Sequence, residues 1–400
     1  MIETNSQVKN KKSIFIFSWG YPSNSTKGNP FVEDAVHLAH DNGIQTTVVV
    51  FQFKNIIERF FSLKKHLTYS SKRGEEIAVV SIYNIPMIPI GWRKRLILWQ
   101  AKLGIQNLIH RVGKPDLLQQ HYIFHSMPYI TDHIAKTFDI PYVLFEHSPI
   151  YNQKHFDTKF QTFCHPYFSR AGFKAFIDNA QDVFAYKVQT TALTGYFGRN
   201  FKTFDGFLPN YLLSAPSTHA DEVVKTAFTF ACIGTLDDRK GTLRLIEAFS
   251  KIPMAHQCQL VFCGAGPYLE RAKTMIHDFG LENNITITGF IPRASVIAQL
   301  KASDYLVIAS SYETFGMTCI EAMAYGIPVI STKCGGPETI INESVGILCE
   351  NNDISALTEA LIIGYQNKDK YSAVAIQKHF HDHYSETCAW NKMKEIYFRD

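Results

Sequence analysis

The sequence predicts an α/β protein made of two doubly wound, Rossmann-like domains. The main observation is that short apolar segments alternate with helical patterns, and that this alternation runs twice along the chain. Such alternation is typical of parallel sheets covered by helices. The second observation is the length of 400 residues, with 46% apolar and 19% charged residues. This length and composition suit two globular domains of ordinary size.

The first series of elements occupies the N-terminal half. Its clearest helix covers residues 33–41, where apolar side chains recur at helical spacing and Asn42-Gly43 ends the helix. The expected strands are residues 13–19, 45–51, 77–80, 117–120 and 142–145. The last strand delivers Glu146 and His147 to a carboxyl strand end, which is where open α/β sheets bind ligands.

The second series begins near Phe228. Its expected strands are residues 228–233, 259–263, 285–288, 305–309 and 329–331, and its expected helices are residues 242–250, 268–279 and 295–302. Pro209-Asn210 and the polar stretch 214–221 mark the boundary between the series. We therefore expect an N-terminal domain over residues 1–212 and a C-terminal domain over residues 213–383. A last helix, at about 384–400, is expected to pack back on the first domain.

Composition argues against several classes of protein. The net charge of +4 is too small and too diffuse to indicate nucleic-acid binding. The apolar run 14–17 is too short for the core of a signal peptide, and no stretch approaches the ~20 apolar residues of a membrane span. The eight cysteines show no metal-binding spacing and suit small core side chains in a reducing compartment. We therefore expect a cytoplasmic protein.

Two glutamates are the most informative feature of the second series. Glu313 lies on a loop that contains Gly316, and Glu321 lies two turns into a helix that Gly326 and Pro328 end. This spacing places two carboxylates at the mouth of one βα unit, where they can accept hydrogen bonds from the hydroxyls of a sugar or a ribose. The alternative is a capping glutamate followed by an ordinary surface glutamate.

The surrounding residues resemble a known family. The run 310–330, followed by Gly335-Gly336-Pro337-Glu338, resembles the donor site of retaining glycosyltransferases of family 4, which have the GT-B fold with two domains facing a cleft. The resemblance covers most of residues 228–350. It extends more weakly to Tyr21-Pro22, to residues 28–32, to His121, to Glu146-His147-Ser148 and to Pro209-Asn210.

The resemblance implies a role for each residue of the glutamate loop. Glu313 would contact the hydroxyls of the donor sugar near the anomeric centre, and Glu321 would accept hydrogen bonds from both ribose hydroxyls. Thr314, Phe315 and Gly316 would present backbone N–H groups to the donor. Glycine suits this position because it lets another molecule approach the backbone closely.

The loop from Gly234 to Lys240 departs from the family pattern. The family has an arginine directly after the first glycine and a lysine before the second, and both would neutralise the diphosphate of the donor. Here the lysine is Lys240, but Thr235 replaces the arginine. Arg239 is the nearest substitute in the sequence. The alternative for Lys240 is a solvated loop lysine.

Two N-terminal positions complete the expected site. In the family, a histidine at the position of His147 lies near the reacting sugar and the acceptor, and a loop at the position of Gly28 approaches the donor phosphate. The catalytic candidates are therefore Glu313, His147 and Lys240. The alternatives are a structural histidine for His147 and a plain turn for Gly28. Gly264-Ala265-Gly266 lacks the third glycine of a dinucleotide fingerprint and predicts a tight turn.

The implied activity is transfer of a sugar from a nucleotide-diphosphate sugar, with retention, to a glycan or a lipid-linked acceptor in cell-surface polysaccharide or glycoconjugate synthesis. No Asp-x-Asp cluster follows a strand, so we expect no metal and no other cofactor. One alternative is a protein of this fold that binds nucleotide sugars with little turnover, which Thr235 would favour. Another is a sugar phosphorylase or an epimerase on the same fold.

Two stretches of the N-terminal domain, residues 59–73 and 92–99, mix basic and aromatic residues. Such helices can lie on an anionic membrane face, and the resemblance implies this for members that act on lipid-linked acceptors. The alternative, which the sequence favours slightly, is a solvated helical face with a buried aromatic stripe. We therefore expect a cytoplasmic protein, with peripheral contact at the inner membrane face as the second interpretation.

Overall fold

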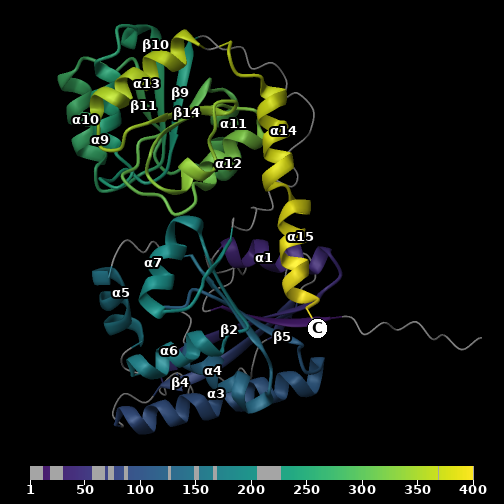
Figure 1. Ribbon diagram of the computed structural model, residues 1–400. Coiled ribbons are helices and arrows are strands. Elements are labelled where there is room, and N and C mark those ends of the chain that lie inside the picture. Colours follow the sequence, from purple (N-terminus) through teal and green to yellow (C-terminus); the bar gives the residue numbers. More distant parts are fainter. Residues whose placement is uncertain are drawn as a thin grey trace, which may run out of the picture. The chain divides into compact units, whose positions relative to one another are not determined.

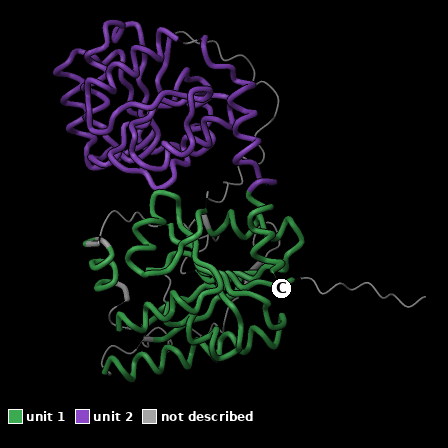
Figure 2. The backbone as a smooth tube through the Cα atoms, in the orientation of Figure 1, with its two compact units in different colours: residues 1–210, 389–400 green, residues 211–388 purple. Residues whose placement is uncertain are grey.

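The chain forms two compact units. The computed structural model describes residues 12–18, 30–55, 68–70, 76–84, 89–124, 128–147, 153–164, 169–204, 227–367 and 369–399. Unit 1 contains residues 1–210 and 389–400, and unit 2 contains residues 211–388 (Figure 2). The division at 210/211 lies two residues before the boundary expected from the sequence.

Unit 1 is built on an eight-stranded sheet in the order β3-β4-β2-β1-β5-β6-β7-β8. The strands are β1 Ser13–Ser18, β2 Gln45–Asn55, β3 Thr68–Ser70, β4 Glu76–Asn84, β5 Leu117–His121, β6 Tyr142–Glu146, β7 Asp182–Ala185 and β8 Lys202–Thr203. All neighbours pair in parallel except β3 and β4. Every residue of β1, β5 and β6 is buried, as expected for a parallel sheet covered on both faces.

Helices cover both faces of this sheet. They are α1 Pro30–Asp41, α3 Ile90–Val112, α4 Pro128–Phe138, α5 Gln153–Lys159, α6 Arg170–Asn179 and α7 Lys187–Phe197, with a π-helical turn at Phe160–Cys164. α3, α4 and α6 lie on one side, and α1 lies on the other with the end of α15, Glu386–Tyr397 (Figure 1). α3 approaches β4 closely, because a Cβ atom on Gly104 would lie 2.5 Å from Val80.

Unit 2 contains a six-stranded parallel sheet in the order β11-β10-β9-β12-β13-β14. Its strands are β9 Phe228–Ile233, β10 Cys258–Cys263, β11 Ile285–Ile287, β12 Tyr305–Ile308, β13 Val329–Thr332 and β14 Gly346–Cys349. Its helices are α9 Thr242–Ser250, α10 Leu269–Asp278, α11 Arg293–Lys301, α12 Met317–Ala324, α13 Ile354–Gln366 and α14 Ala373–Tyr384. α9, α10 and α13 cover one face, and α11, α12 and α14 cover the other (Figure 1).

Both sheets are doubly wound, which confirms the predicted fold class. In unit 2 the first strand, β9, lies in the interior between β10 and β12, so the winding reverses at β9. In unit 1 the first strand, β1, lies in the same way between β2 and β5. Ligands of open α/β sheets bind outside the carboxyl ends of the strands at such reversals. The loops that follow β9 and β12 are therefore where a site is expected in unit 2.

The end of α15 is bonded to unit 1. The hydroxyl of Tyr397 donates to Oε1 of Gln119 at 2.8 Å, and Arg399 donates to Asp182 at 2.5 Å. The chain therefore returns from unit 2 to the sheet of unit 1 at its C-terminal end. Among the described helices, none is long and apolar enough to cross a membrane.

Candidate functional site

The loop after β9 brings its lysine to the end of β12. Gly234 begins this loop with φ +145°, and a Cβ atom there would lie 3.2 Å from Cε of Lys240. The lysine side chain therefore folds back over the start of its own loop. The backbone of the loop is held by Asp237, whose carboxylate accepts a hydrogen bond from the N–H of Lys240 at 2.7 Å.

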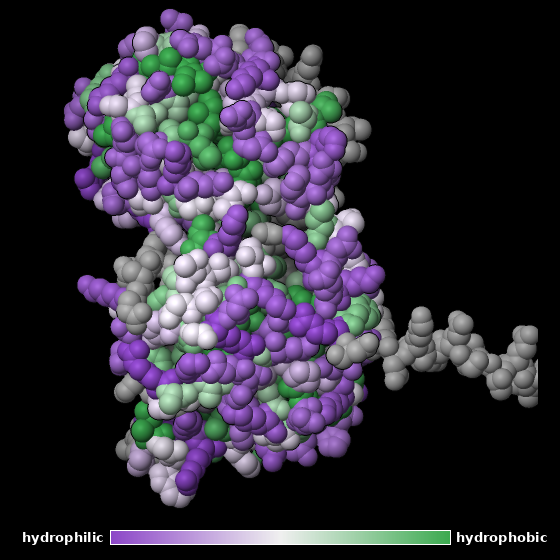
Figure 3. All heavy atoms as spheres, in the orientation of Figure 1, coloured by the Kyte–Doolittle hydropathy of each residue, from purple (hydrophilic) through white to green (hydrophobic). Residues whose placement is uncertain are grey.

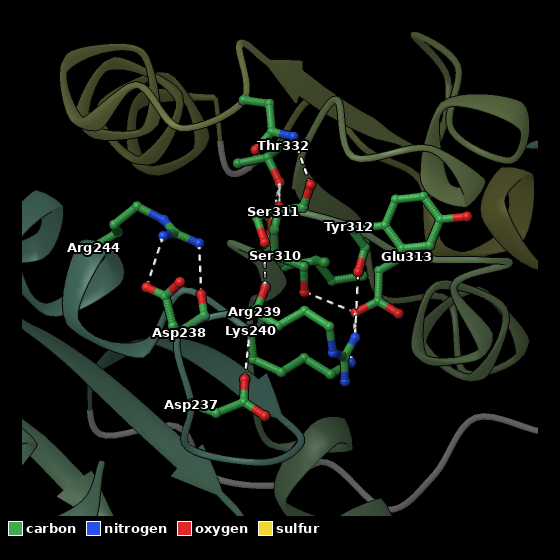
Figure 4. A network of polar contacts seen from close by, with 12 residues as sticks. Asp237, Asp238, Arg239, Lys240, Arg244, Ser310, Ser311, Tyr312, Glu313 and Thr332 are labelled. Carbon is green, nitrogen blue, oxygen red and sulfur yellow. Dashed lines mark hydrogen bonds and ion pairs between the residues drawn. The ribbon is translucent and has the colours of Figure 1, made fainter. Parts of the chain in front are cut away.

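The carboxylate of Glu313 gathers several polar groups on one oxygen (Figure 4). Nζ of Lys240 donates to Oε1 at 2.6 Å, and Oγ of Ser310 donates to the same oxygen at 2.7 Å. Nη1 of Arg239 lies 3.5 Å from it. The side chains of Glu313 and Lys240 are 12% and 20% exposed, whereas that of Arg239 is 40% exposed. The structure therefore brings together Arg239 and Lys240 from one loop and Glu313 from another.

The acidic residues next to the basic pair have other partners. Asp237 accepts from the backbone, as described, and Asp238 pairs with Arg244 at 3.4 Å. Figure 4 shows both carboxylates directed away from the Glu313 cluster. Arg239 and Lys240 therefore supply positive charge to this end of the sheet without neutralisation by their neighbours in sequence.

The loop of Glu313 is held by backbone contacts with the segment after β13. The N–H of Glu313 donates to the carbonyl of Cys334 at 2.8 Å, and the N–H of Gly336 donates to the carbonyl of Glu313 at 2.9 Å. A Cβ atom on Gly336 would lie 2.2 Å from the carbonyl oxygen of Phe315. This close approach explains a glycine at 336 and determines where the Glu313 loop lies.

Helix α12 begins directly after that loop. Gly316, with φ +93°, is its N-cap, and Phe315 is buried beneath it. The positive end of the helix dipole therefore lies beside the Glu313 loop, a position that suits anionic groups. Thr314 is half-buried between these residues.

Glu321, in the second turn of α12, forms an ion pair with a residue that the sequence analysis missed. Nη2 of Arg293, the first residue of α11, lies 2.5 Å from Oε1 of Glu321, and the glutamate side chain is only 7% exposed. Arginine at the start of a helix carries no motif of its own. Its pairing depends on α11 and α12 lying on the same face of the sheet, which the sequence does not show.

A pocket of about 350 Å³ lies beside this ion pair, at the carboxyl ends of β9, β10 and β11. Its lining includes Gly234, Thr235, Gly264, Phe290 and Arg293. The ring of Phe290 is 85% exposed at this place. Gly264 makes the tight turn that was expected, because a Cβ atom there would lie 1.8 Å from the carbonyl oxygen of Gly234. The volume is within the range of small-molecule sites in proteins.

Near the site, the thiol of Cys232 is half-buried and that of Cys334 is buried. Burial raises the pKa of Cys232 to about 12 and that of Cys334 to about 11. Both are therefore protonated at neutral pH and behave as small apolar side chains. Within the described part of the chain, no group of three or more histidine, cysteine or acidic side chains is placed to hold a metal ion.

His147 lies at the carboxyl edge of the sheet in unit 1, as the sequence predicted, but it is buried. Its Nε2 lies 2.9 Å from Nδ1 of His121, and its Nδ1 lies 3.2 Å from the hydroxyl of Tyr186. Burial lowers the pKa of His147 to about 3, so the ring is neutral. Both ring nitrogens thus contact protein groups, an arrangement that corresponds to the structural alternative for this residue. Contact of its N–H with a sugar stays a prediction.

The site of unit 2 lies in a segment that matches a family model. Residues 217–378 match the family model described as glycosyl transferases group 1. Over this segment the chain is therefore similar to group 1 glycosyl transferases. The segment includes Gly234, Lys240, Glu313 and Glu321, so these candidate residues all fall inside the matched range.

The names of curated relatives of this segment refer to different sugars. The relatives include the GDP-mannose-dependent alpha-(1-6)-phosphatidylinositol monomannoside mannosyltransferase of Mycobacterium tuberculosis, 29% identical over 33% of this chain and 37% of that protein. N-acetyl-alpha-D-glucosaminyl L-malate synthase of Bacillus anthracis is 32% identical over 30% of this chain and 31% of that protein. The aligned part thus spans about a third of the length of these relatives.

Solved structures resemble the chain over nearly its whole length. Sucrose-phosphate synthase from Thermosynechococcus elongatus gives a TM-score of 0.67 at 18% identity, with 97% of this chain and 98% of that chain covered. Alr3699/HepE of Anabaena in complex with UDP gives 0.68 at 18% identity, with coverage of 96% and 99%. These likenesses show that the chain has the GT-B fold.

Several sequence predictions fall outside the described residues. They are the loop role of Gly28, the interdomain Pro209-Asn210, the motif residues Tyr21-Pro22 and Ser148, and the basic residues Arg59, Lys64, Lys65, Lys72 and Arg73. In contrast, Trp92 and Trp99 on α3 are described, and they are 66% and 57% exposed. The alternative of a buried aromatic stripe is therefore wrong for these two residues, because α3 buries the opposite side, through residues such as Ile97 and Ile105.

Proposed function

We propose that this chain is a retaining glycosyltransferase that moves a sugar from a nucleotide-diphosphate sugar to a glycan or lipid-linked acceptor. The observation that carries the proposal is the cluster of Arg239, Lys240 and Ser310 around the carboxylate of Glu313. The cluster lies at the winding reversal of the sheet in unit 2, where α/β sheets bind ligands, and inside the segment that matches the group 1 family model.

The donor would bind to unit 2. We assign the nucleoside to the pocket at the ends of β9, β10 and β11, because its volume and its largely apolar lining suit a base and a ribose. Glu321 would then accept hydrogen bonds from the ribose hydroxyls, and Arg293 would orient its carboxylate through the ion pair. The diphosphate would extend from this pocket toward Lys240, past Thr235.

The chemistry would depend on charge at the leaving group. As the bond between sugar and phosphate breaks, negative charge builds on the diphosphate and positive charge builds at the anomeric carbon. Lys240 and Arg239 would stabilise the first, and the carboxylate of Glu313 would stabilise the second. The leaving phosphate would accept the proton of the acceptor hydroxyl on the same face of the sugar, which leads to retention. Because two cations already lie here, the proposal includes no metal ion.

The acceptor would bind to unit 1, and we propose that this unit contacts an anionic membrane. α3 exposes Trp92, Trp99 and Leu103 on one side, and Arg95 lies beside Trp92 with its guanidinium 5.6 Å from the ring. Tryptophan and arginine together are typical of helices that lie in a lipid interface. Over the lower part of unit 1, Figure 3 shows hydrophobic residues among hydrophilic ones. A lipid-linked acceptor in cell-surface glycoconjugate synthesis, at the cytoplasmic face, would fit this surface.

A two-stage assay tests the proposal. Nucleotide-diphosphate sugars are first screened by thermal shift, since a ligand that binds the folded state raises the melting temperature. The donor that binds is then incubated with lipid extract, and the anomeric configuration of the product is determined by NMR. Transfer with retention is the expected result. Inversion would contradict the mechanism, and binding without transfer or hydrolysis would favour the alternative of a binding protein with little turnover.

A further inference from the structure

A chain of four hydrogen bonds crosses the interior of unit 1. Tyr397, in the last turn of α15, places its hydroxyl 2.8 Å from Oε1 of Gln119, and Nε2 of Gln119 lies 2.8 Å from Nε2 of His121. Nδ1 of His121 lies 2.9 Å from Nε2 of His147, whose Nδ1 lies 3.2 Å from the hydroxyl of Tyr186. All five side chains are buried. We call these five residues the relay.

The relay lies across the carboxyl edge of the sheet. His121 is the last residue of β5, His147 follows β6, and Tyr186 follows β7, and these three strands are neighbours. Gln119 is two residues before His121 and so lies on the same face of β5. The rings of His121 and His147 are nearly parallel, with centroids 5.1 Å apart and planes 12° apart, and they meet edge to edge through their nitrogens. Three adjacent strands thus hold the relay rigidly at the edge where ligands bind.

The amide of Gln119 gives the relay a direction. An amide accepts at its oxygen and donates at its nitrogen. Because the hydroxyl of Tyr397 donates to the oxygen, the nitrogen faces His121 and donates to its Nε2. The proton of His121 must then lie on Nδ1, from which it is donated to Nε2 of His147. The proton of His147 must lie on its own Nδ1, and it is donated to Tyr186.

The same pattern requires both rings to be neutral. A protonated imidazole carries a hydrogen on each nitrogen and could not accept from its neighbour in the relay. Burial, with a smaller contribution from His147, lowers the pKa of His121 well below its ordinary value, and burial lowers the pKa of His147 to about 3. The charge state thus agrees with the direction set by the amide.

We propose that Tyr397 is a positioning residue, which holds His147 in the Nδ1–H tautomer through Gln119 and His121. The consequence for catalysis rests on the proposed function. The ring of His147 is neutral and has a fixed orientation, and its centroid lies 5.1 Å from that of the Tyr122 ring. Tyr122 is half-buried and has φ +64°, a strained value that is frequent at functional sites. The relay would thus support the acceptor side of the transfer from within unit 1.

A second contact at the same end of α15 provides a matched control. Arg399 pairs with Asp182 at 2.5 Å, and Lys202 pairs with the same carboxylate at 2.5 Å. Neither of these contacts includes a member of the relay. Arg399→Gln therefore weakens the anchoring of α15 without removing a hydrogen bond of the relay.

Histidine tautomers in the full-length protein test the proposal directly. Long-range ¹⁵N NMR of the histidine-labelled chain distinguishes Nδ1–H, Nε2–H and charged rings, and His147→Gln assigns the signal. In the wild type at pH 7.5 we expect Nδ1–H for His147. In Tyr397→Phe the amide loses the donor that orients it, so we expect a shift toward Nε2–H, the form that free histidine favours in water. Arg399→Gln should keep the wild-type signal.

Two outcomes would overturn the proposal: an Nε2–H or charged His147 in the wild type, and an unchanged tautomer in Tyr397→Phe. If Tyr397→Phe fails to fold, Tyr397→Met also removes the hydroxyl donor while it keeps Gln119 in place and fills the site with a flexible apolar side chain, and it should show the same shift. Tautomers are measured without donor or acceptor. They therefore stay informative even if the glycosyltransferase assay fails. In that assay, we expect Tyr397→Phe to lower transfer several-fold and to leave nucleotide binding by unit 2 unchanged.

Discussion

At the scale of single residues, the candidate site is organised around two carboxylates, each with its own polar partners. Glu313 is contacted by two cations and one hydroxyl, whereas Glu321 is paired with Arg293. Thr235, where the family resemblance implies arginine, lines the pocket and leaves Arg239 as the second cation near Lys240. Substitution of Arg239 therefore tests whether this residue replaces the missing arginine.

Arg239→Ala should lower turnover more than it weakens nucleotide binding, because charge builds on the diphosphate only as the bond breaks. A charge-assisted contact contributes about 1.5–3 kcal/mol. The Arg239 side chain is 40% exposed, so solvent screening favours the lower end of that range, or about a tenfold loss in turnover. Steady-state kinetics measure the effect. The control is Arg244→Ala, which loses only the pair with Asp238. Equal turnover in the two variants would show that Arg239 is not the second cation that stabilises the diphosphate.

Glu321→Gln should weaken binding of the nucleotide while the fold stays intact. The amide keeps the shape of the side chain but replaces one acceptor oxygen with a donor, so one ribose hydroxyl loses its partner. We expect roughly a tenfold rise in Kd, which corresponds to about 1.4 kcal/mol. Calorimetric titration with the nucleotide alone measures this. An unchanged Kd, with unchanged thermal stability, would show that Glu321 does not bind the ribose.

The buried histidines should make stability depend on pH. The pKa of His147 is about 3 in the folded state and about 6.5 in the unfolded chain. Between these values the unfolded state binds more protons, so stability is complete above about pH 6.5 and falls as pH falls toward 3. The slope from one such histidine is at most about 1.4 kcal/mol per pH unit. Urea unfolding measures the free energy of unfolding of the wild type and of His147→Gln. The difference between the two proteins should shrink from pH 7.5 to pH 5. A constant difference would contradict the buried neutral ring.

At the scale of elements, sequence periodicity predicted most strands but not their partners. The expected strands 45–51 and 117–120 correspond to β2 and β5, which extend further at their carboxyl ends. β14 and α13 were not predicted. The antiparallel strand β3 was also missed, since three residues are too few for a pattern. Pairing across a sheet depends on residues distant in sequence, so local pattern cannot supply it.

Helix α3 carries the prediction for membrane contact. Trp92→Ala with Trp99→Ala should reduce binding to vesicles that contain anionic lipid, because two amphipathic rings leave the interface. Flotation of vesicles with the two variants measures the bound fraction. The matched control is Phe279→Ala, an exposed aromatic residue of unit 2 at 40% exposure, which should bind as the wild type does. Equal binding by the double variant would show that α3 is not the contact surface.

At the scale of the whole molecule, activity should survive removal of divalent metal. The proposal assigns the leaving-group charge to Lys240, to Arg239 and to the N-terminal end of α12. Initial rates of sugar transfer after treatment with EDTA, compared with untreated enzyme, measure this. A loss of rate that Mg²⁺ or Mn²⁺ restores would show that a metal shares the charge at the diphosphate.

The sequence by itself determined the GT-B fold class and most of the donor-side candidates. Alternation of strands and helices is a local property, and the Glu313 loop and the Lys240 loop are each a short motif that the sequence shows directly. Only the tertiary structure decided that Lys240, Arg239 and Ser310 meet on one oxygen of Glu313, and that Arg293 holds Glu321. It also decided that His147 is buried in a relay ending at Tyr397, 250 residues along the chain. The physical reason is that sheet order and helix packing bring distant residues together, and no local pattern records those contacts.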